Sequence, residues 1–399
     1  MRPVLSVEEY LGELLALVEP LAAEPCPVDA ALGRTLAAPV TSRGEVPAFA
    51  NSAMDGFAVH ADDLRVGAVL REVAEVAAGN GEDPGFGPGE CVRIMTGAPM
   101  PSDADTVIQR ELVTEVPGGV RIDDVVALGA NIRGAGEDLH AGQEVLGVGH
   151  ALDPGAIGLV AACGRAEVLV SRRPRVAVAA TGDELVAPGG DLGRGQIFES
   201  NGHQLRAALT RDGAEVIALG VLPDQPDAFA RGLDGAAGAD LIVLAGGVSV
   251  GDHDVARIVL SDRAGGQFRH VRMQPGKPQG FAHWNGTPVV ALPGNPMSAA
   301  ISYELFVRAL LDRMAGRAPR TWLPALAGSG WRSPAGRRQL VPVVTSVTDA
   351  GVLTAHPAHR RGSASHLVSA LALADSLAMV AEDVTEVGPG DRLLVRSLA

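Results

Sequence analysis

Short glycine-rich turns and a solitary lysine are the features of this sequence with the clearest chemical potential. The run Gly246-Gly247-Val-Ser249-Val-Gly251 can bring backbone N–H groups and a hydroxyl close to an anion, because glycine lets the main chain approach a ligand. Lys277 lies between two prolines, is the only lysine of the chain, and offers a rigidly mounted cation for phosphate or another oxyanion. A flexible turn and a solvated surface lysine are the alternative interpretations.

Acidic side chains accompany these turns. Asp183, Glu184, Asp224 and Asp254 all follow segments with strand-like or glycine-rich sequences. Carboxylates that face a phosphate usually hold Mg²⁺ through one or two oxygens, while the ion keeps several waters. Capping of a helix N-terminus is the competing role for an aspartate after a strand. Capping is the favoured role for Asp183, whereas Asp254 fits a cap and a metal ligand equally well.

The elements that must position these side chains alternate between strand and helix from about residue 175 to residue 316. Such alternation indicates a mostly parallel sheet with helices on both faces. Ligands of such sheets bind beyond the carboxyl ends of the strands, so we expect the turns to share one edge. Strands are expected at 176–180, 215–219, 240–245 and 287–292, and helices at 201–211, 226–233 and 297–314.

Shorter elements flank this region. Ser6 and Glu9 form a capping-box pattern ahead of helically spaced leucines, and Pro20 marks the expected helix end. Short strand-like segments between glycine and proline clusters indicate a β-rich domain from about 40 to 142, and similar segments return after residue 321. Asp55 and Thr96 lie in polar segments of the first β-rich part, which taken alone are typical of turns.

Composition narrows the classes of function. The chain has 399 residues and a formal net charge of −14, so we expect two to four domains and no broad binding of nucleic acid or of a membrane. Its three cysteines form no CxxC pair, which favours neither a disulfide framework nor a cysteine zinc site. The N-terminus has no signal-peptide pattern and no apolar run is long enough to span a bilayer, so we expect a cytoplasmic protein.

Taken together, these segments resemble the molybdopterin molybdenumtransferase family, the MoeA-like proteins, which are similar to the E domain of gephyrin. The resemblance covers essentially the whole chain, and the joint order of its motifs is highly specific. The motifs are Ser52-Ala-Met-Asp-Gly-Phe-Ala, Thr96-Gly-Ala-Pro, Gly136-Glu-Asp, Thr181-Gly-Asp-Glu-Leu, Ser200-Asn-Gly, Gly246-Gly-Val-Ser-Val-Gly, Pro275-Gly-Lys-Pro and Leu292-Pro-Gly-Asn-Pro.

The resemblance implies an elongated homodimer of multidomain α/β plus β chains. Adenylylated molybdopterin and molybdate would be converted to the molybdenum cofactor, AMP and water with Mg²⁺ as cofactor, and a molybdopterin adenylyltransferase would be a transient substrate donor. The implied domains are a discontinuous N-terminal dimerisation domain (1–40 and 142–172), an inserted β-rich domain (41–141), a three-layer α/β molybdopterin-binding domain (173–318) and a C-terminal β-barrel (319–399).

The resemblance also implies site residues, carried over motif by motif. Asp55 and Thr96 would reach the active site from the inserted domain, which the partner subunit would supply. Asp254 and Asp224 would be the metal ligands. The implied catalytic set is Asp55, Thr96, Glu184, Asp224, Asp254 and Lys277, and the implied binding set is Gly246, Gly247, Ser249, Gly251, Pro278, Ser298, Arg337 and Ser365.

The sequence departs from the family pattern at three positions where family members usually carry a basic residue: Gln274, His270 and Pro342. Arg338, Arg360 and Arg361 are candidates to compensate. Two alternatives to the transferase therefore stay open. One is a scaffold or binding paralogue, and the other is a nucleotide-handling enzyme that does not insert molybdenum.

Overall fold

The computed structural model describes residues 4–248 and 254–398, which form two compact units. The larger unit comprises Met1–Glu24, Gly33–Ala37 and Val170–Ala399, and the smaller comprises Pro25–Leu32 and Ala38–Leu169. Each unit is described by itself. Among the described residues, no helix is both long and apolar enough to cross a lipid bilayer.

The centre of the larger unit is a six-stranded sheet with the order β16-β13-β17-β21-β20-β18. The first four strands in this order are parallel, as the sequence predicts, and the last two add an antiparallel edge that was not predicted. The strands are β13 (Arg175–Thr181), β16 (Glu215–Leu222), β17 (Leu241–Ala245), β18 (Gln267–His270), β20 (Pro278–Trp284) and β21 (Thr287–Leu292).

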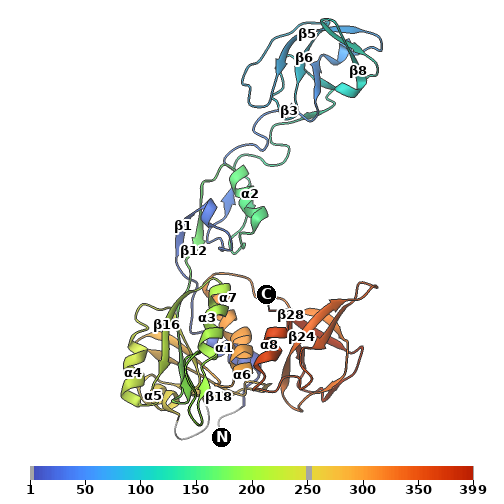
Figure 1. Ribbon diagram of the computed structural model, residues 1–399. Helices are drawn as coiled ribbons and strands as arrows, with labels where there is room; N and C mark the ends of the chain where they lie inside the picture. The colour runs from blue at the N-terminus through green and yellow to red at the C-terminus, as the bar shows by residue number, and fades with distance from the viewer. Residues whose placement is uncertain (1–3, 249–253, 399) are drawn as a thin grey trace. The chain divides into compact units, whose positions relative to one another are not determined.

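Helices cover both faces of this sheet (Figure 1). One apolar core lies under α4 (Pro226–Asp234) and α5 (Val255–Arg263), and the other lies under α1 (Val7–Leu15), α3 (Asn201–Arg211) and the helix that begins at Pro296. That last helix consists of α6 (Pro296–Ser302), a π-helical segment, η4 (Tyr303–Val307), and α7 (Arg308–Met314). The predicted helix is thus continuous, but its middle turn is wider than an α-helical turn.

Helix α1 starts at the predicted capping box. The Ser6 hydroxyl accepts from the Glu9 N–H at 3.1 Å, and the Glu9 carboxylate accepts from the Ser6 N–H at 2.6 Å. The helix ends at Leu15, before the expected Pro20, because the following residues turn so that Val18 joins the same core. Tyr10 packs edge-on against Phe306, with ring centroids 5.0 Å apart. These contacts group α1 with the larger unit, and the four-domain boundaries stay a prediction.

The C-terminal part of the larger unit is the expected β-barrel. Five strands form a closed ring in which each pairs with the next, in the order β24-β25-β22-β28-β26 and back to β24. The barrel strands are β22 (Leu323–Ala327), β24 (Arg338–Val347), β25 (Leu353–Pro357), β26 (Ser376–Val380) and β28 (Arg392–Ser397), with α8 (Val368–Leu373) before β26 and a short pair of β23 (Trp331–Arg332) with β27 (Glu386–Val387). Strand β19 (Met273–Gln274) runs parallel to β24 and connects the α/β part to the barrel.

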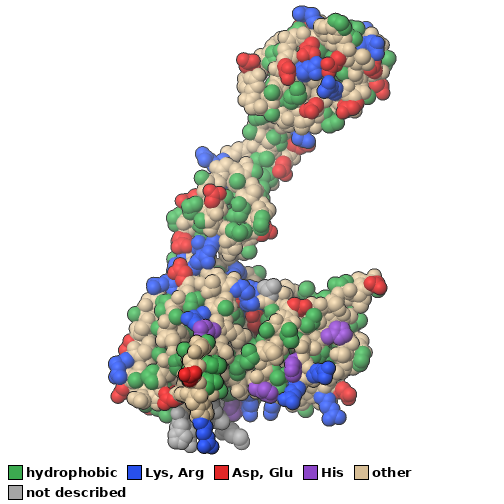
Figure 2. All heavy atoms as spheres, viewed as in Figure 1, with side chains coloured by type: hydrophobic (Ala, Val, Ile, Leu, Met, Phe, Trp, Pro, Cys, Tyr) green, Lys and Arg blue, Asp and Glu red, His purple; other side chains and the backbone are tan. Residues whose placement is uncertain are grey.

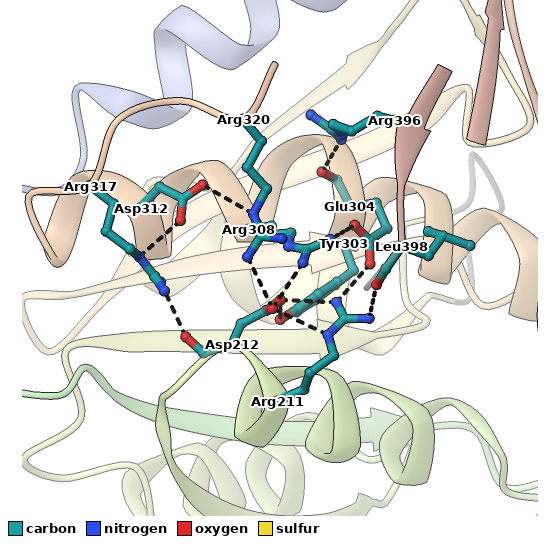
Figure 3. Close-up of polar contacts among 10 residues, drawn as sticks. All are labelled: Arg211, Asp212, Tyr303, Glu304, Arg308, Asp312, Arg317, Arg320, Arg396 and Leu398. Atoms are coloured by element: carbon teal, nitrogen blue, oxygen red, sulfur yellow. Dashed lines mark hydrogen bonds and ion pairs between the residues drawn. The ribbon is translucent and has the colours of Figure 1, made fainter. Parts of the chain in front are cut away.

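A buried network of ion pairs and hydrogen bonds joins the end of α3, the π-helical segment η4, α7 and β28 (Figure 3). Arg308 contacts Asp212 at 3.2 Å and donates to the Glu304 carboxylate at 2.6 Å. Arg211 also bridges these two acids, at 3.1 and 2.9 Å, and Arg396 donates to the Glu304 carbonyl at 2.5 Å. The network therefore connects the barrel to the α/β part through charged groups that have fixed partners inside the protein.

The smaller unit is rich in strands, as predicted. Its main sheet has the order β7-β4-β6-β5-β9-β8, and Asp153 caps its helix α2 (Pro154–Ala162) by accepting from the Ala156 N–H at 2.8 Å. The strands are β4 (Gly56–Val59), β5 (Val69–Val76), β6 (Glu90–Ile94), β7 (Thr106–Gln109), β8 (Val113–Val116) and β9 (Gly119–Ile122). Short pairs are formed by β3 (Asn51–Ser52) with β10 (Ile132–Arg133) and by β2 (Val40–Thr41) with β11 (Glu144–Leu146).

Candidate active site

A pocket of about 410 Å³ opens at the carboxyl ends of the parallel strands. Five separate stretches of the α/β domain line it, which agrees with the expected convergence on one edge. Of the predicted site residues, Glu184, Gly246, Gly247 and Pro278 lie in its wall. Further lining residues include Thr181, Asn201, Pro293, Gly294, Asn295 and Pro296, together with the short strands β14 (Leu185–Val186) and β15 (Ile197–Phe198).

The glycine turn after β17 requires glycine for steric reasons. Gly246 and Gly247 have φ values of +102° and +76°. A Cβ atom on Gly247 would lie 2.3 Å from the Ala256 Cβ and 2.9 Å from Asp254 Oδ1. The turn therefore brings bare main chain to the pocket and against the start of α5. Ser249 and Gly251, which complete the predicted anion-binding run, lie outside the described residues.

We expect Gly247→Ala to disturb this turn much more than Gly265→Ala does. Both glycines have positive φ, but a Cβ on Gly265 would meet nothing within 4 Å. The control should cost about 1–2 kcal/mol of backbone strain, and Gly247→Ala should add about 1–3 kcal/mol of overpacking. Urea unfolding of the two variants measures the difference, and equal losses of stability would contradict the steric argument.

Asp224 and Asp183 hold together the turns that follow β16 and β13. Asp224 accepts from the Thr181 hydroxyl at 2.8 Å and from the Asp183 N–H at 3.0 Å, while Asp183 accepts from the Asp224 N–H at 3.2 Å. The expectation that Asp183 caps a helix is therefore wrong, because its carboxylate binds the main chain of a neighbouring turn. This reciprocal pairing fixes both turns at the edge of the pocket.

Asp254 is the N-cap of α5 and accepts from the Arg257 N–H at 3.3 Å. A Cβ atom on Gly247 would lie 2.9 Å from Asp254 Oδ1 and 3.2 Å from the Thr181 methyl group, so both side chains border this glycine. The Thr181 hydroxyl in turn donates to Asp224. Among the described residues, no group of three or more His, Cys, Asp and Glu side chains could hold a metal ion. Mg²⁺ needs only one or two protein carboxylates when substrate phosphates and waters complete its shell. Asp224 and Asp254 each offer hard carboxylate oxygens, the type of ligand that Mg²⁺ takes.

Lys277 reaches the same edge because β20 runs antiparallel to β21. Gly280 pairs with Ala291, so the start of β20 lies beside the carboxyl end of β21. The lysine side chain is exposed. His270 pairs with Pro278 across β18 and β20, next to Lys277. Burial lowers the pKa of His270, and the positive charges of Lys277 and Arg257 lower it further. Lys, Arg and His side chains are visible along the lower rim of the larger unit (Figure 2).

The barrel contributes residues next to this edge. The Ser365 carbonyl accepts from the Met297 N–H at 3.2 Å, and its hydroxyl accepts from Asn295 Nδ2 at 3.4 Å. Because Asn295 lines the pocket, Ser365 lies next to the pocket wall. Ser298 is buried in α6, and Arg337 donates to Gln274 Oε1 at 3.2 Å from the exposed side of the lysine turn.

Asn201 is a pocket residue that the predicted set omits. Its Nδ2 donates to the Gly294 carbonyl at 2.6 Å and so links the start of α3 to the turn after β21. The Ser200-Asn-Gly motif was a recognisable signal, but its sequence did not reveal which turn it contacts.

Asp55 and Thr96 form a local pair within the smaller unit. Asp55 Oδ1 accepts from the Thr96 N–H at 2.7 Å and from the Thr96 hydroxyl at 2.8 Å. Both bonds lower the pKa of the Asp55 carboxyl, because both donors favour its charged form, and the bond from the Thr96 N–H has the larger effect. The turn interpretation of both segments is compatible with this geometry, and a role of the pair at the pocket stays a prediction.

We expect Thr96→Val to raise the pKa of Asp55 part of the way to its ordinary value, since the hydroxyl donor is lost and the N–H remains. Because folding lowers this pKa, the stabilising contribution is present above the unfolded-state pKa and disappears as the pH falls through the folded-state pKa. NMR titration of the carboxyl carbons measures the shift. Asp83, whose pKa is lowered by the Ser102 N–H, serves as the internal control and should not change. An unchanged Asp55 would contradict the assignment.

Comparison with known proteins covers nearly the whole chain. Residues 5–164 match the family model described as MoeA N-terminal region (domain I and II), residues 177–313 match probable molybdopterin binding domain, and residues 324–398 match MoeA C-terminal region (domain IV). The chain is 38% identical to Molybdopterin molybdenumtransferase 2 of Mycobacterium tuberculosis, with 100% of each chain covered. It is 33% identical to the Molybdopterin molybdenumtransferase of Haemophilus influenzae, over 92% of this chain and 91% of the relative.

Solved structures agree with the sequence relatives. The crystal structure of a molybdopterin biosynthesis moeA protein from Pyrococcus horikoshii superimposes with a TM-score of 0.82 at 29% identity, with 100% of both chains covered. A second crystal structure of a moeA protein from strain OT3 of that organism has a TM-score of 0.83 at 25% identity, over 98% of this chain and 99% of the other. The similarity therefore extends over both units and the barrel.

Proposed function

Because the chain belongs to the molybdopterin molybdenumtransferase family, we propose that it catalyses the molybdenum insertion step of molybdenum cofactor biosynthesis. Adenylylated molybdopterin and molybdate are the substrates, and the molybdenum cofactor, AMP and water are the products. The observation that carries this proposal is the convergence of the Gly246-Gly247 turn, paired acidic turns and the lysine turn on one edge of the sheet.

The residues of the pocket suit a substrate with several negative charges. The main chain at Gly246 and at Lys277 is held by hydrogen bonds of the fold, so the turns that carry the proposed oxyanion donors need not reorganise when substrate binds. Molybdate is a tetrahedral dianion and requires donors of this kind. From the barrel, Ser365 adds a hydroxyl and Arg337 adds a guanidinium. The overall charge of −14 does not prevent binding, since the field at the pocket depends on the nearby basic groups.

Mg²⁺ completes this proposal, held by Asp224 and Asp254. When bound, the ion polarises phosphate oxygens and neutralises the charge that develops as AMP leaves. The Thr181 hydroxyl and the Asp183 N–H orient the Asp224 carboxylate, and Glu184 adds a further acid to the wall. We further propose that the protein acts in the cytoplasm as a homodimer, that Asp55 and Thr96 of the partner complete the site, and that an adenylyltransferase delivers the substrate.

The experiment that tests the function is an AMP-release assay with purified protein and adenylylated molybdopterin. AMP should form only when molybdate and Mg²⁺ are both present, and chelation with EDTA should stop it. AMP release that does not depend on molybdate would support a nucleotide-handling enzyme instead. No release under any condition, with the protein folded, would support a scaffold or binding protein.

A further inference from the structure

Gln279 is a fully buried polar residue that the predicted site does not contain. It lies near the start of β20, two residues after Lys277. Its Nε2 donates to the Gly276 carbonyl at 2.7 Å and to the Ser302 hydroxyl at 2.6 Å. Its Oε1 has no hydrogen-bond partner among the described residues. Because the Gly276 carbonyl can only accept, the amide orientation is fixed.

The unpaired oxygen shows that Gln279 does not serve packing alone. A buried polar atom without a partner lowers stability, and an apolar side chain of the same shape avoids that penalty. Methionine would therefore fill the space at least as well. What methionine cannot supply is the pair of N–H donors to Gly276 and Ser302. Glutamine at this position therefore contributes two directed N–H donors that an apolar side chain would lack.

The first donor fixes the main chain of Lys277. The Gly276 carbonyl and the Lys277 N–H belong to one planar trans peptide and point in opposite directions. A bond from Gln279 to that carbonyl therefore turns the Lys277 N–H away from the core. The Lys277 carbonyl is held as well, since it accepts from the Val271 N–H at 2.8 Å. Both peptide groups of the lysine thus have fixed orientations, while its side chain stays exposed.

The turn itself has little freedom to adapt. Gly276 has a φ of +102°, and a Cβ there would lie 2.9 Å from the Met273 Cε and 3.1 Å from the Ser302 hydroxyl. The second donor connects this turn to Ser302, the last residue of α6. The same helix begins at Pro296 in the pocket wall, next to the contact with Ser365. Gln279 therefore links the lysine turn to the helix that supports the opposite wall.

We propose that Gln279 is a positioning residue that orients the Lys277 N–H and ammonium toward one oxyanion, the molybdate of the proposed reaction. The inference rests on the proposed function. It adds that anion binding depends on the Gln279 side chain, which does not itself contact the anion. Its effect should appear in anion affinity, because the donors hold the geometry of the binding turn.

The test uses Gln279→Met in the full-length protein. Equilibrium dialysis against molybdate, with bound molybdenum quantified, should show about tenfold weaker binding, as expected when positioning worth one hydrogen bond is lost. The KM for molybdate should rise by a similar factor, while the KM for adenylylated molybdopterin stays within about twofold. Gln267→Met is the matched control, because Gln267 is an exposed glutamine on the neighbouring strand β18 and its side chain accepts from the Arg269 guanidinium.

Several outcomes would overturn the inference. Wild-type affinity in Gln279→Met would do so, as would an equal effect of Gln267→Met or a uniform loss of activity with both KM values unchanged. If Gln279→Met does not fold, Ser302→Ala removes one acceptor of the Gln279 amide and should also weaken molybdate binding. Unchanged molybdate binding in Ser302→Ala would also overturn the inference. If the wild type binds no molybdate and releases no AMP, the proposed function itself fails.

Discussion

Replacement of Lys277 by methionine is expected to lower molybdate-dependent AMP release about 100-fold, the usual cost of removing one preorganised donor to an oxyanion. No second lysine exists in the chain to take its place. In this variant burial and the positive charge of Arg257 still lower the pKa of the nearby His270, which makes that ring a poor substitute for the lost cation. Methionine keeps most of the side-chain length, so the loss reports the charge.

Arg263→Met is the control for this prediction. Arg263 is a basic residue of the same domain that lies at the end of α5 and pairs with Asp227 at 2.7 Å, with both side chains exposed. Its removal should leave the rate within about twofold of wild type, as for a surface ion pair. If Lys277→Met keeps more than half of the wild-type rate, the lysine has no role in the reaction.

The largest expected effect on stability is that of Arg308→Met. The Arg308 side chain is 2% exposed, and its carboxylate partners Asp212 and Glu304 are 2% and 7% exposed. Removal of one member of a buried ionic group costs about 3–5 kcal/mol, because acids remain buried with one cation fewer. Figure 3 shows that Arg211 also reaches both acids, so the network is weakened and not abolished.

Urea unfolding followed by tryptophan fluorescence measures this effect. Trp284, Trp322 and Trp331 are the only tryptophans of the chain and all lie in the larger unit, so the signal reports the unit that contains the network. Arg313→Met is the matched control on the same helix, since Arg313 is 40% exposed and pairs with an exposed Glu19. It should cost at most about 1 kcal/mol. Equal losses in the two variants would contradict the assigned role of burial.

Local sequence signals predicted most elements of the α/β domain. The bounds of α3 agree with its helical spacing, and the capping box at Ser6 is present. Strand β20 was missed because Pro278 and Gly280 are typical of turns, and its strand geometry depends on pairing with β21. The π-helical segment had no local signal, since the widened turn accompanies the buried contacts of Glu304 with distant residues.

The sequence predicted which turns of the chain meet at the candidate site, but not the contacts that their side chains make. Strand ends of a parallel sheet converge on one edge, and this rule placed Glu184, Gly247 and Pro278 together correctly. The partners of individual side chains were not predictable, because they depend on which turns meet in space. Asp183 illustrates this point, since it binds the turn of Asp224 and caps no helix.

The exposed lysine turn makes the chain unusual for chemical labelling. Lys277 is the only lysine and its side chain is open to solvent, so it provides the sole side-chain primary amine of the protein. For an amine-directed acylating reagent, this side chain and the N-terminal amine are therefore the primary amines of the chain. A fluorophore or crosslinker attached to Lys277 would lie next to Pro278 in the pocket wall without any engineered residue.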